Sequence, residues 1–257
     1  MPADTWQAFY ASDLQGLYAL WIAPALFLLY LAVAPPPGAG IAPEAAPFVR
    51  RYALVFAIVT MLDPLAGGPL LRWLGLATGS VATVVTIAFV LLGDFRVFLL
   101  LFALIALHDG RDAGAALRAA SLRAAVWTLV TPAATVLTIG VLGTLRGPLP
   151  TQATWLVYEC VFLGLALGLR VWLVERRVPG ESPRLRAYLR ALLAFVALYY
   201  ALWASADALI LGAGLDLGWA LRIVPNQLYY GLWIPFVYGA FFAPRTAATR
   251  SVAQASR

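Results

Sequence analysis

The stretch SVATVVTIAFVLLGDFRVFLLLFALIAL, which occupies residues 80–107, decides the fold class of this chain. Only Asp94 and Arg96 interrupt it with a charge. About 20 consecutive apolar residues, each rising about 1.5 Å in an α-helix, are enough to cross the hydrocarbon core of a bilayer. The stretch is longer than that, and it therefore predicts a transmembrane helix.

Similar apolar runs follow one another along the chain, and the polar gaps between them are too short to hold another domain. The chain is 63% hydrophobic and 12% charged, whereas soluble domains are about half apolar and about a quarter charged. We expect an all-α, polytopic integral membrane protein with about seven transmembrane helices. The predicted spans are residues 14–34, 52–72, 80–107, 122–145, 152–174, 187–212 and 218–242.

The domain organisation expected from these runs is a single transmembrane domain over residues 1–244, followed by a short, disordered cytosolic tail at 245–257. The first apolar run is longer than the apolar region of a signal peptide, and no arginine precedes it. We therefore expect an uncleaved first helix.

Arginines are distributed very unevenly between alternate sides of the predicted bundle. One side receives only Arg72 and Arg146 close to the helix ends. The other side receives Arg50, Arg51, Arg111, Arg118, Arg123, Arg176, Arg177, Arg184, Arg186, Arg190, Arg245 and Arg250. Because basic loops stay in the cytosol, we expect the N-terminus outside and the C-terminus cytosolic, in a bacterial inner (plasma) membrane.

The net charge of +6 does not indicate nucleic-acid binding, because the arginines lie in short loops beside apolar runs and form no basic stripe. The expected partner is the lipid bilayer. All 18 basic residues are arginine, so no lysine can form a Schiff base with a cofactor. His108, Asp109 and Asp112 suit a solvated helix end better than a metal site, and we expect neither metal nor cofactor.

Three charged residues fall near the middle of the membrane, where an ionisable side chain costs at least about 2.5 kcal/mol. Asp63, Asp94 and Arg96 are predicted to form a buried charge network, with a structural or a functional role. Arg96 and Asp94 are two residues apart and diverge around the helix, so we expect Arg96 to pair with Asp63. Arg222, near a helix end, is expected to extend to the outer surface.

A second polar layer lies in the predicted outer half of the membrane, on the last three spans. Glu159, Asp207 and Asn226 fall there at similar depth, each beside aromatic residues on the same helix face. We expect them to border one cavity, although ordinary apolar packing would also explain the rings. The predicted ligand-binding residues are Glu159, Tyr200, Trp203, Asp207, Asn226, Gln227, Tyr229, Tyr230 and Trp233.

Prolines interrupt two of the predicted spans beside polar side chains. Pro64 and Pro69 lie in the second span, and Pro225 precedes Asn226 in the last. Broken helices of this kind occur at transporter sites, while a simple kink is the alternative. Gly164 and Gly168 form a GxxxG motif, which permits close helix packing within the chain or in a homo-oligomer.

Short resemblances to known families cover little of the chain. Seven spans with an outer N-terminus resemble a microbial rhodopsin in outline, but there is no lysine to hold retinal. Pro225-Asn226-Gln227 is similar to the proline motifs of PQ-loop and SWEET sugar transporters, which lie in the first helix of each three-helix repeat. Gly93-Asp94 and residues 205–210, SADALI, resemble two aspartate motifs of the eight-span lysoplasmalogenase-like membrane hydrolases.

Three functions are compatible with these observations. The leading hypothesis is binding or transport of a small solute or amphipathic ligand through an outward-opening aromatic and polar cavity. An intramembrane lipid-modifying enzyme could use Asp94 and Asp207 as acid and base, but no serine, cysteine or histidine constellation supports nucleophilic catalysis. The third is a structural or assembly subunit of a membrane complex.

Overall fold

A computed structural model describes residues 5–35, 37–38, 40–110, 112–178 and 182–243. Over these residues every regular element is a helix. The tail predicted at 245–257 and the loop residue Arg111 lie outside the described residues.

Six helical stretches are long and apolar enough to cross a membrane. They indicate a membrane-embedded, multi-pass protein of the all-helical class. Their bounds are Leu14–Val33, Pro43–Trp73, Ser80–His108, Ala113–Arg146, Thr151–Arg177 and Pro183–Ala213.

Several of these stretches consist of more than one element. The elements are α1 (Thr5–Tyr10), η1 (Leu14–Tyr18), α2 (Ala19–Val33), η2 (Pro43–Ala45), α3 (Ala46–Leu65), η3 (Ala66–Leu70), α4 (Leu71–Trp73), α5 (Ser80–His108), α6 (Ala113–Arg146), α7 (Thr151–Gly168), η4 (Leu169–Leu173), α8 (Val174–Arg177), α9 (Pro183–Ala213), α10 (Leu217–Asn226), η5 (Gln227–Leu232) and α11 (Trp233–Phe242). Of the η elements, η2 is a 3₁₀ turn and the others are π-helical.

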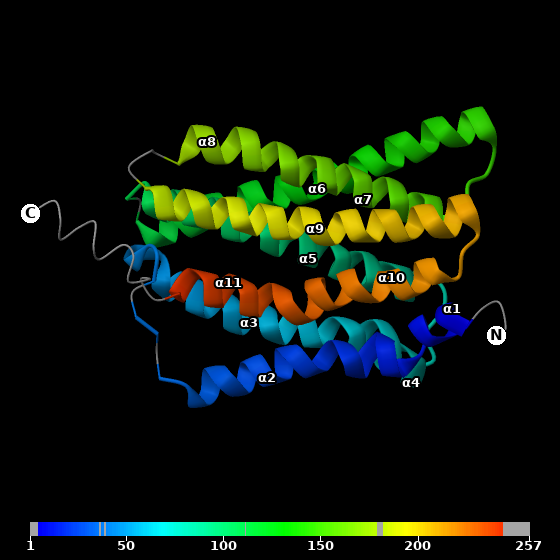
Figure 1. The fold of residues 1–257 in the computed structure, drawn as a ribbon, viewed down its shortest axis with the longest axis horizontal. Coiled ribbons are helices and arrows are strands. Elements are labelled where there is room, and N and C mark those ends of the chain that lie inside the picture. Colours follow the sequence, from blue (N-terminus) through cyan, green and yellow to red (C-terminus); the bar gives the residue numbers. More distant parts are fainter. Residues whose placement is uncertain (1–4, 36, 39, 111, 179–181, 244–257) are drawn as a thin grey trace, which may run out of the picture.

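The last helical stretch, formed by α10, η5 and α11, is not among the six. It carries the polar side chains of Arg222, Asn226 and Gln227 in its first half. In Figure 1 it nevertheless runs from one end of the bundle to the other. It packs against α9 through α10, against α2 through η5 and against α3 through α11.

The bundle is built around α5, which is the most buried of the six stretches. The second half of α5 supplies buried apolar side chains at every position from Val97 to Leu107 except Leu99, which is half-buried. Most of its first half, by contrast, is exposed or half-buried. The helices lie roughly along one long axis, with α1 and the start of α10 at one end and the end of α11 at the other (Figure 1).

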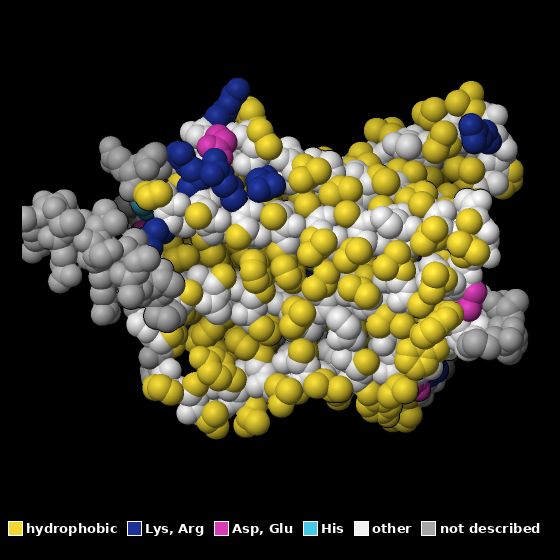
Figure 2. All heavy atoms as spheres, viewed as in Figure 1, with side chains coloured by type: hydrophobic (Ala, Val, Ile, Leu, Met, Phe, Trp, Pro, Cys, Tyr) yellow, Lys and Arg dark blue, Asp and Glu magenta, His cyan; other side chains and the backbone are white. Residues whose placement is uncertain are grey.

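The outer surface has the character expected of a bilayer-facing bundle. Leu122, Val136, Leu137 and Val171 are each at least 70% exposed. Apolar side chains extend along the visible face in Figure 2, while basic side chains gather over α8 and the beginning of α9. Figure 2 therefore shows one strongly basic end of the molecule.

The helices begin earlier than the hydropathy pattern predicted at two places. The second stretch starts at Pro43 rather than near residue 52, and α6 starts at Ala113 rather than near residue 122. Both added segments are rich in alanine and contain arginine, which are good helix formers outside the hydrocarbon layer as well.

The proline-containing spans remain helical instead of unwinding. After Pro64 the chain passes into η3, and after Pro225 it passes into η5. Because proline has no N–H to donate, the pattern of backbone hydrogen bonds must change beside it, and a π-helical turn is one way to do so. The interruption is a change of helical pitch, not a broken helix.

The GxxxG motif does not bring two helices of this chain together. A β-carbon added at Gly164 or at Gly168 would meet nothing within 4 Å. Packing within the chain, which we expected as the use of this motif, is therefore not what these two glycines provide. Homo-oligomer formation through them stays a prediction.

Candidate functional site

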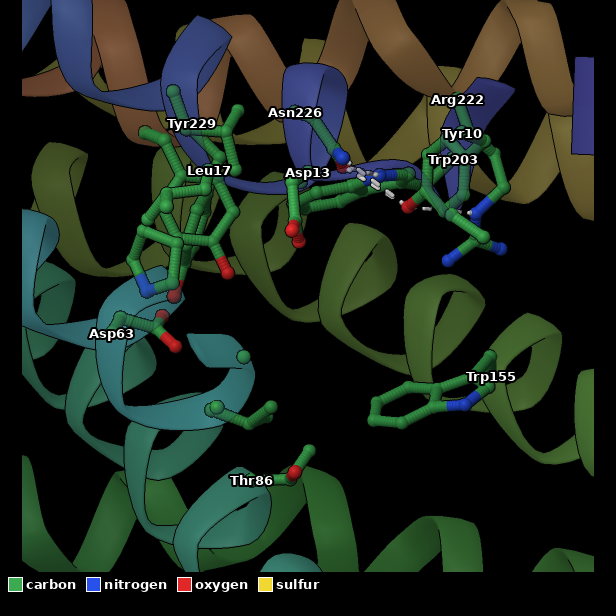
Figure 3. Close-up of a pocket in the computed structure, with 18 of the residues that line it drawn as sticks. Tyr10, Asp13, Leu17, Asp63, Thr86, Trp155, Trp203, Arg222, Asn226 and Tyr229 are labelled. Atoms are coloured by element: carbon green, nitrogen blue, oxygen red, sulfur yellow. Dashed lines mark hydrogen bonds between the residues drawn. The ribbon is translucent and has the colours of Figure 1, made fainter. Parts of the chain in front are cut away.

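A cavity of about 420 Å³ lies at the end of the bundle that carries α1 (Figure 3). The first part of the chain contributes Tyr10, Asp13 and Leu17, and the second and third stretches contribute Asp63 and Thr86. From the later helices, Trp155, Trp203, Arg222, Asn226 and Tyr229 face the same space. Three π-helical elements, η1, η3 and η5, border it, and π-helical turns are frequent at functional sites.

Asp94 lies on the inner wall of this cavity and is only 1% exposed. Two tyrosine hydroxyls, those of Tyr158 and Tyr200, donate hydrogen bonds to its two carboxylate oxygens, the latter at 2.6 Å. The three residues come from α5, α7 and α9. Two strong donors compensate part of the cost of burying a carboxylate.

The backbone beside Asp94 allows another tyrosine to come very close. A β-carbon added at Gly93 would lie 1.5 Å from the hydroxyl oxygen of Tyr229. Only glycine leaves room for this hydroxyl. Gly93 therefore sets the position of a ring that lines the cavity.

Arg222 joins two carboxylates in a buried cluster. Its guanidinium donates to Asp207 and lies 3.9 Å from the Oε1 atom of Glu159. Gln152 also donates to Asp207, at 2.6 Å. The Arg222 side chain is 12% exposed, so our expectation that it extends to the outer surface is wrong, because two buried carboxylates hold it inward.

One oxygen of each carboxylate in this cluster has no hydrogen-bond partner. The unpartnered atoms are Oε2 of Glu159 and Oδ2 of Asp207. Glu159 lines the cavity, whereas Asp207 lies behind it. A buried oxygen without a partner is costly, and that of Glu159 belongs to a residue on the cavity wall.

A polar network links α1 to α9 and α10. Asn226 accepts a hydrogen bond from the indole N–H of Trp203 at 3.0 Å and donates one to the Tyr10 hydroxyl at 3.2 Å. The carboxylate of Asp216 accepts from the backbone N–H groups of Trp6 and Gln7, at 2.8 and 3.0 Å. Together these contacts hold α1 over the cavity end of α10.

The mouth of the cavity is bordered by an ion pair between Asp13 and Arg72, 2.6 Å apart. Both side chains are about half exposed, at 55% and 51%. An ion pair with this exposure contributes little to stability.

Arg96 does not form the ion pair with Asp63 that we expected. Its guanidinium donates instead to the Thr60 hydroxyl at 3.0 Å and to the Tyr229 carbonyl at 2.8 Å. It also lies over the ring of Tyr229, 4.1 Å from the ring centre. The expected pairing is wrong because neutral hydrogen-bond acceptors and an aromatic ring from neighbouring helices surround the guanidinium. The depth of a residue in the membrane does not show which of these groups it will meet.

Asp63 lies on the cavity wall near Tyr230, whose hydroxyl is within hydrogen-bonding reach. Among the described residues no ion pair joins Asp63 to a basic side chain. The three residues of the predicted charge network are thus close to one another without direct pairing.

The structure brings most of the predicted site residues to one cavity. Glu159, Tyr200, Trp203, Asn226, Tyr229 and Tyr230 line it together with Asp63 and Asp94. Asp207, Gln227, Trp233 and Arg96 do not. The indole N–H of Trp233 donates to the hydroxyl of Tyr52, in the core.

The contribution of the N-terminal segment to the cavity was not predicted from the sequence. Tyr10, Ser12 and Asp13 line the cavity although they precede or begin the first apolar run. No periodic pattern marks them. The hydrogen bond from Tyr158 to Asp94 was not predicted either.

No family model, curated protein or solved structure matches this chain. The fold and the cavity define its class, a helical multi-pass membrane protein with a polar, aromatic-lined cavity at one end. Among the described residues, no group of three His, Cys, Asp or Glu side chains could hold a metal ion. The chemistry that the cavity offers is hydrogen bonding, charge and aromatic contact.

Proposed function

We propose that this protein binds a small solute or an amphipathic ligand in the cavity at the α1 end, as a binding or transport protein. The observation that carries the proposal is a cavity of about 420 Å³ that combines aromatic walls with the buried carboxylate of Asp94. Ligand sites commonly measure roughly 300–1,000 Å³ and contain a few fixed polar groups among apolar walls.

The proposal includes seven crossings, with the N-terminus and the cavity outside and the C-terminus in the cytosol of a bacterial inner membrane. The stretch from Leu217 to Phe242 is the seventh crossing, because its length matches that of its neighbours in the bundle (Figure 1). Its polar side chains support this view, since Asn226 and Arg222 face the cavity and not lipid. The basic end over α8 and α9 supports the orientation.

An amphipathic ligand is favoured by the place where α5 borders the cavity. Thr86 lines the cavity and is exposed on the surface of α5, next to exposed apolar residues such as Val84 and Ile87. The cavity wall and the bilayer-facing surface therefore meet at this helix. A ligand with a polar head and an apolar tail fits such a border.

The hypothesis of a lipid-modifying enzyme using Asp94 and Asp207 receives less support. Asp94 is on the cavity wall, but Asp207 lies behind it and is engaged by Arg222 and Gln152. An acid and a base must both reach the reacting group. The geometry therefore favours binding over acid–base catalysis.

Accessibility to a thiol reagent tests the cavity. In a Cys160→Ala background, we expect Tyr230→Cys to react with a membrane-impermeant maleimide added from outside, because Tyr230 lines the cavity. Gln227→Cys, three residues away on η5, is the matched control because Gln227 does not line the cavity and its Oε1 atom lies near Gly231 instead. Equal protection of both positions would contradict an open, outward-facing cavity.

A further inference from the structure

Building on the proposed function, we infer that the ligand is an organic cation, a protonated amine or quaternary ammonium whose head lies beside Asp94 and Glu159. Three observations support this ligand: the ion pairs of the cavity, the unpartnered oxygen of Glu159 and the aromatic walls.

The cavity's own arginines are already neutralised. Arg72 pairs with Asp13 at the mouth, and Arg222 pairs with Asp207 and approaches Glu159. An anionic ligand would have to displace one of these carboxylates to reach a guanidinium. The charges available to a ligand are therefore negative.

No ion pair joins Asp94 to a basic side chain in the described part of the chain. Its contacts are the hydroxyls of Tyr158 and Tyr200, each of which donates one hydrogen bond. A carboxylate has about four acceptor positions on its two oxygens. A cation arriving from the cavity would meet the acceptor capacity that these two donors leave unused.

Glu159 supplies the second, independent observation. It is 4% exposed and lines the cavity, and its Oε2 atom has no hydrogen-bond partner. A carboxylate in such a place is strongly unfavourable unless a proton or a positive group neutralises it. The ligand would be that group.

The charge balance around the cavity agrees with this assignment. Among the residues that line the cavity, four have carboxyl groups (Asp13, Asp63, Asp94 and Glu159) and two have guanidinium groups (Arg72 and Arg222), so the formal net charge with every carboxyl ionised is −2. Arg96 does not line the cavity but lies against the ring of Tyr229.

The aromatic walls specify the kind of cation. Trp155, Tyr200 and Trp203 line the cavity, and in the described structure the guanidinium groups lie over other rings, among them Tyr229 and Tyr10. Indole and phenol faces attract cations, and substituted ammonium groups are the ligands that aromatic cages recognise. A bare metal cation would not use these rings in this way.

The test uses three probes that share an octyl chain: octyltrimethylammonium, octanol and octanoate. Binding to the full chain in lipid nanodiscs is measured by calorimetric titration. We expect the cation to bind at least roughly tenfold more tightly than the neutral and anionic probes.

Substitutions of the cavity residues test where the cation binds. Glu159→Gln and Asp94→Asn should each weaken binding of the cation roughly tenfold without changing octanol binding. Trp203→Phe should weaken it less. Glu175→Gln, which removes a carboxylate paired with Arg190 at the basic end, is the charge-matched control and should have no effect. If Asp94→Asn does not fold, Glu159→Gln carries the test.

The inference would be overturned if all three probes bound with equal affinity or if octanoate bound more tightly than the cation. It would also be overturned if Glu159→Gln left the affinity for the cation unchanged. If octanol or octanoate binds and Tyr230→Cys is labelled, the proposed ligand-binding function is supported but the preference for a cation is not. If no probe binds and Tyr230→Cys is protected, both fail.

Discussion

At the scale of single residues, the position of Tyr229 depends on the missing side chain of Gly93. The Tyr229 ring separates Arg96 from the cavity and also lines the cavity, so its placement affects both. The hydroxyl lies where a β-carbon of residue 93 would be. The Tyr229 hydroxyl is therefore packed directly against the backbone of Gly93.

Gly93→Ala should destabilise the folded protein by about 1–3 kcal/mol, the usual cost of overpacking. Gly140→Ala in α6 is the control, since a β-carbon there would meet nothing within 4 Å. Thermal unfolding in detergent compares the two. Equal melting temperatures would show that Tyr229 does not occupy the space beside residue 93.

The Arg222–Asp207 pair should behave as a coupled unit. Removing either partner leaves a buried charge and should cost about 3–5 kcal/mol, whereas replacing both with apolar residues can be nearly neutral. Arg222→Leu and Asp207→Leu should each lower thermal stability in detergent, and the double variant should recover much of the loss.

The pair of Arg96 and Asp63 is the matched comparison. Because Arg96 donates to Thr60 and to the Tyr229 carbonyl, replacing Asp63 as well should give no comparable recovery. The described pairings would be contradicted if the Arg96→Leu/Asp63→Leu variant regained thermal stability while the Arg222→Leu/Asp207→Leu variant did not.

These residues also show what a sequence can indicate about a site. The depth of Glu159, Asp207 and Asn226 along their helices, with rings on the same face, predicted one shared cavity; Glu159 and Asn226 line it, but Asp207 does not. The partners of Arg96 and Arg222 could not be predicted in this way. A partner depends on the rotation of neighbouring helices, and apolar residues on every face of a membrane helix leave that rotation undetermined.

At the scale of elements, α1 is a short helix held over the cavity by a few polar contacts. Asp216 accepts from the first backbone N–H groups of α1, and Asp13 pairs with Arg72. The helix has six residues and no buried side chain. Its position therefore depends on these contacts more than on packing.

Asp216→Ala should loosen α1 and speed labelling of Tyr230→Cys from outside. Losing a helix N-terminal acceptor costs about 1 kcal/mol, which corresponds to about a fivefold change in an equilibrium constant. Asp216→Asn keeps a side-chain oxygen, so in this variant Tyr230→Cys should be labelled nearly as slowly as with Asp216 in place. An unchanged rate in Asp216→Ala would show that α1 does not cover the cavity.

Elements of the transmembrane region were more predictable than their irregularities. Six of the seven predicted spans correspond to stretches that are long and apolar enough to cross a membrane, and the seventh corresponds to α10, η5 and α11. Pro64 and Pro225 marked the places where helices change, but not the π-helical form of η3 and η5. That form depends on which carbonyls find donors after folding.

At the scale of the whole molecule, composition was enough to predict an all-helical membrane bundle. It did not predict that α5 would be the central helix, because core-facing and lipid-facing residues are equally apolar. The stretch at 80–107 that marks the fold also supplies Asp94 and Arg96. Its second half is buried in the core, and Thr86 and Val90 of its first half border the cavity.

The central claim is an outward-facing ligand cavity in a bundle of seven crossings, and reporter fusions test it most directly. Gly147 follows the last turn of α6 at the same end as the cavity. We predict that alkaline phosphatase fused at Gly147 is active and that a fusion after Arg245 is inactive. Activity at Arg245 with none at Gly147 would place the cavity in the cytosol, and activity at both would contradict seven crossings.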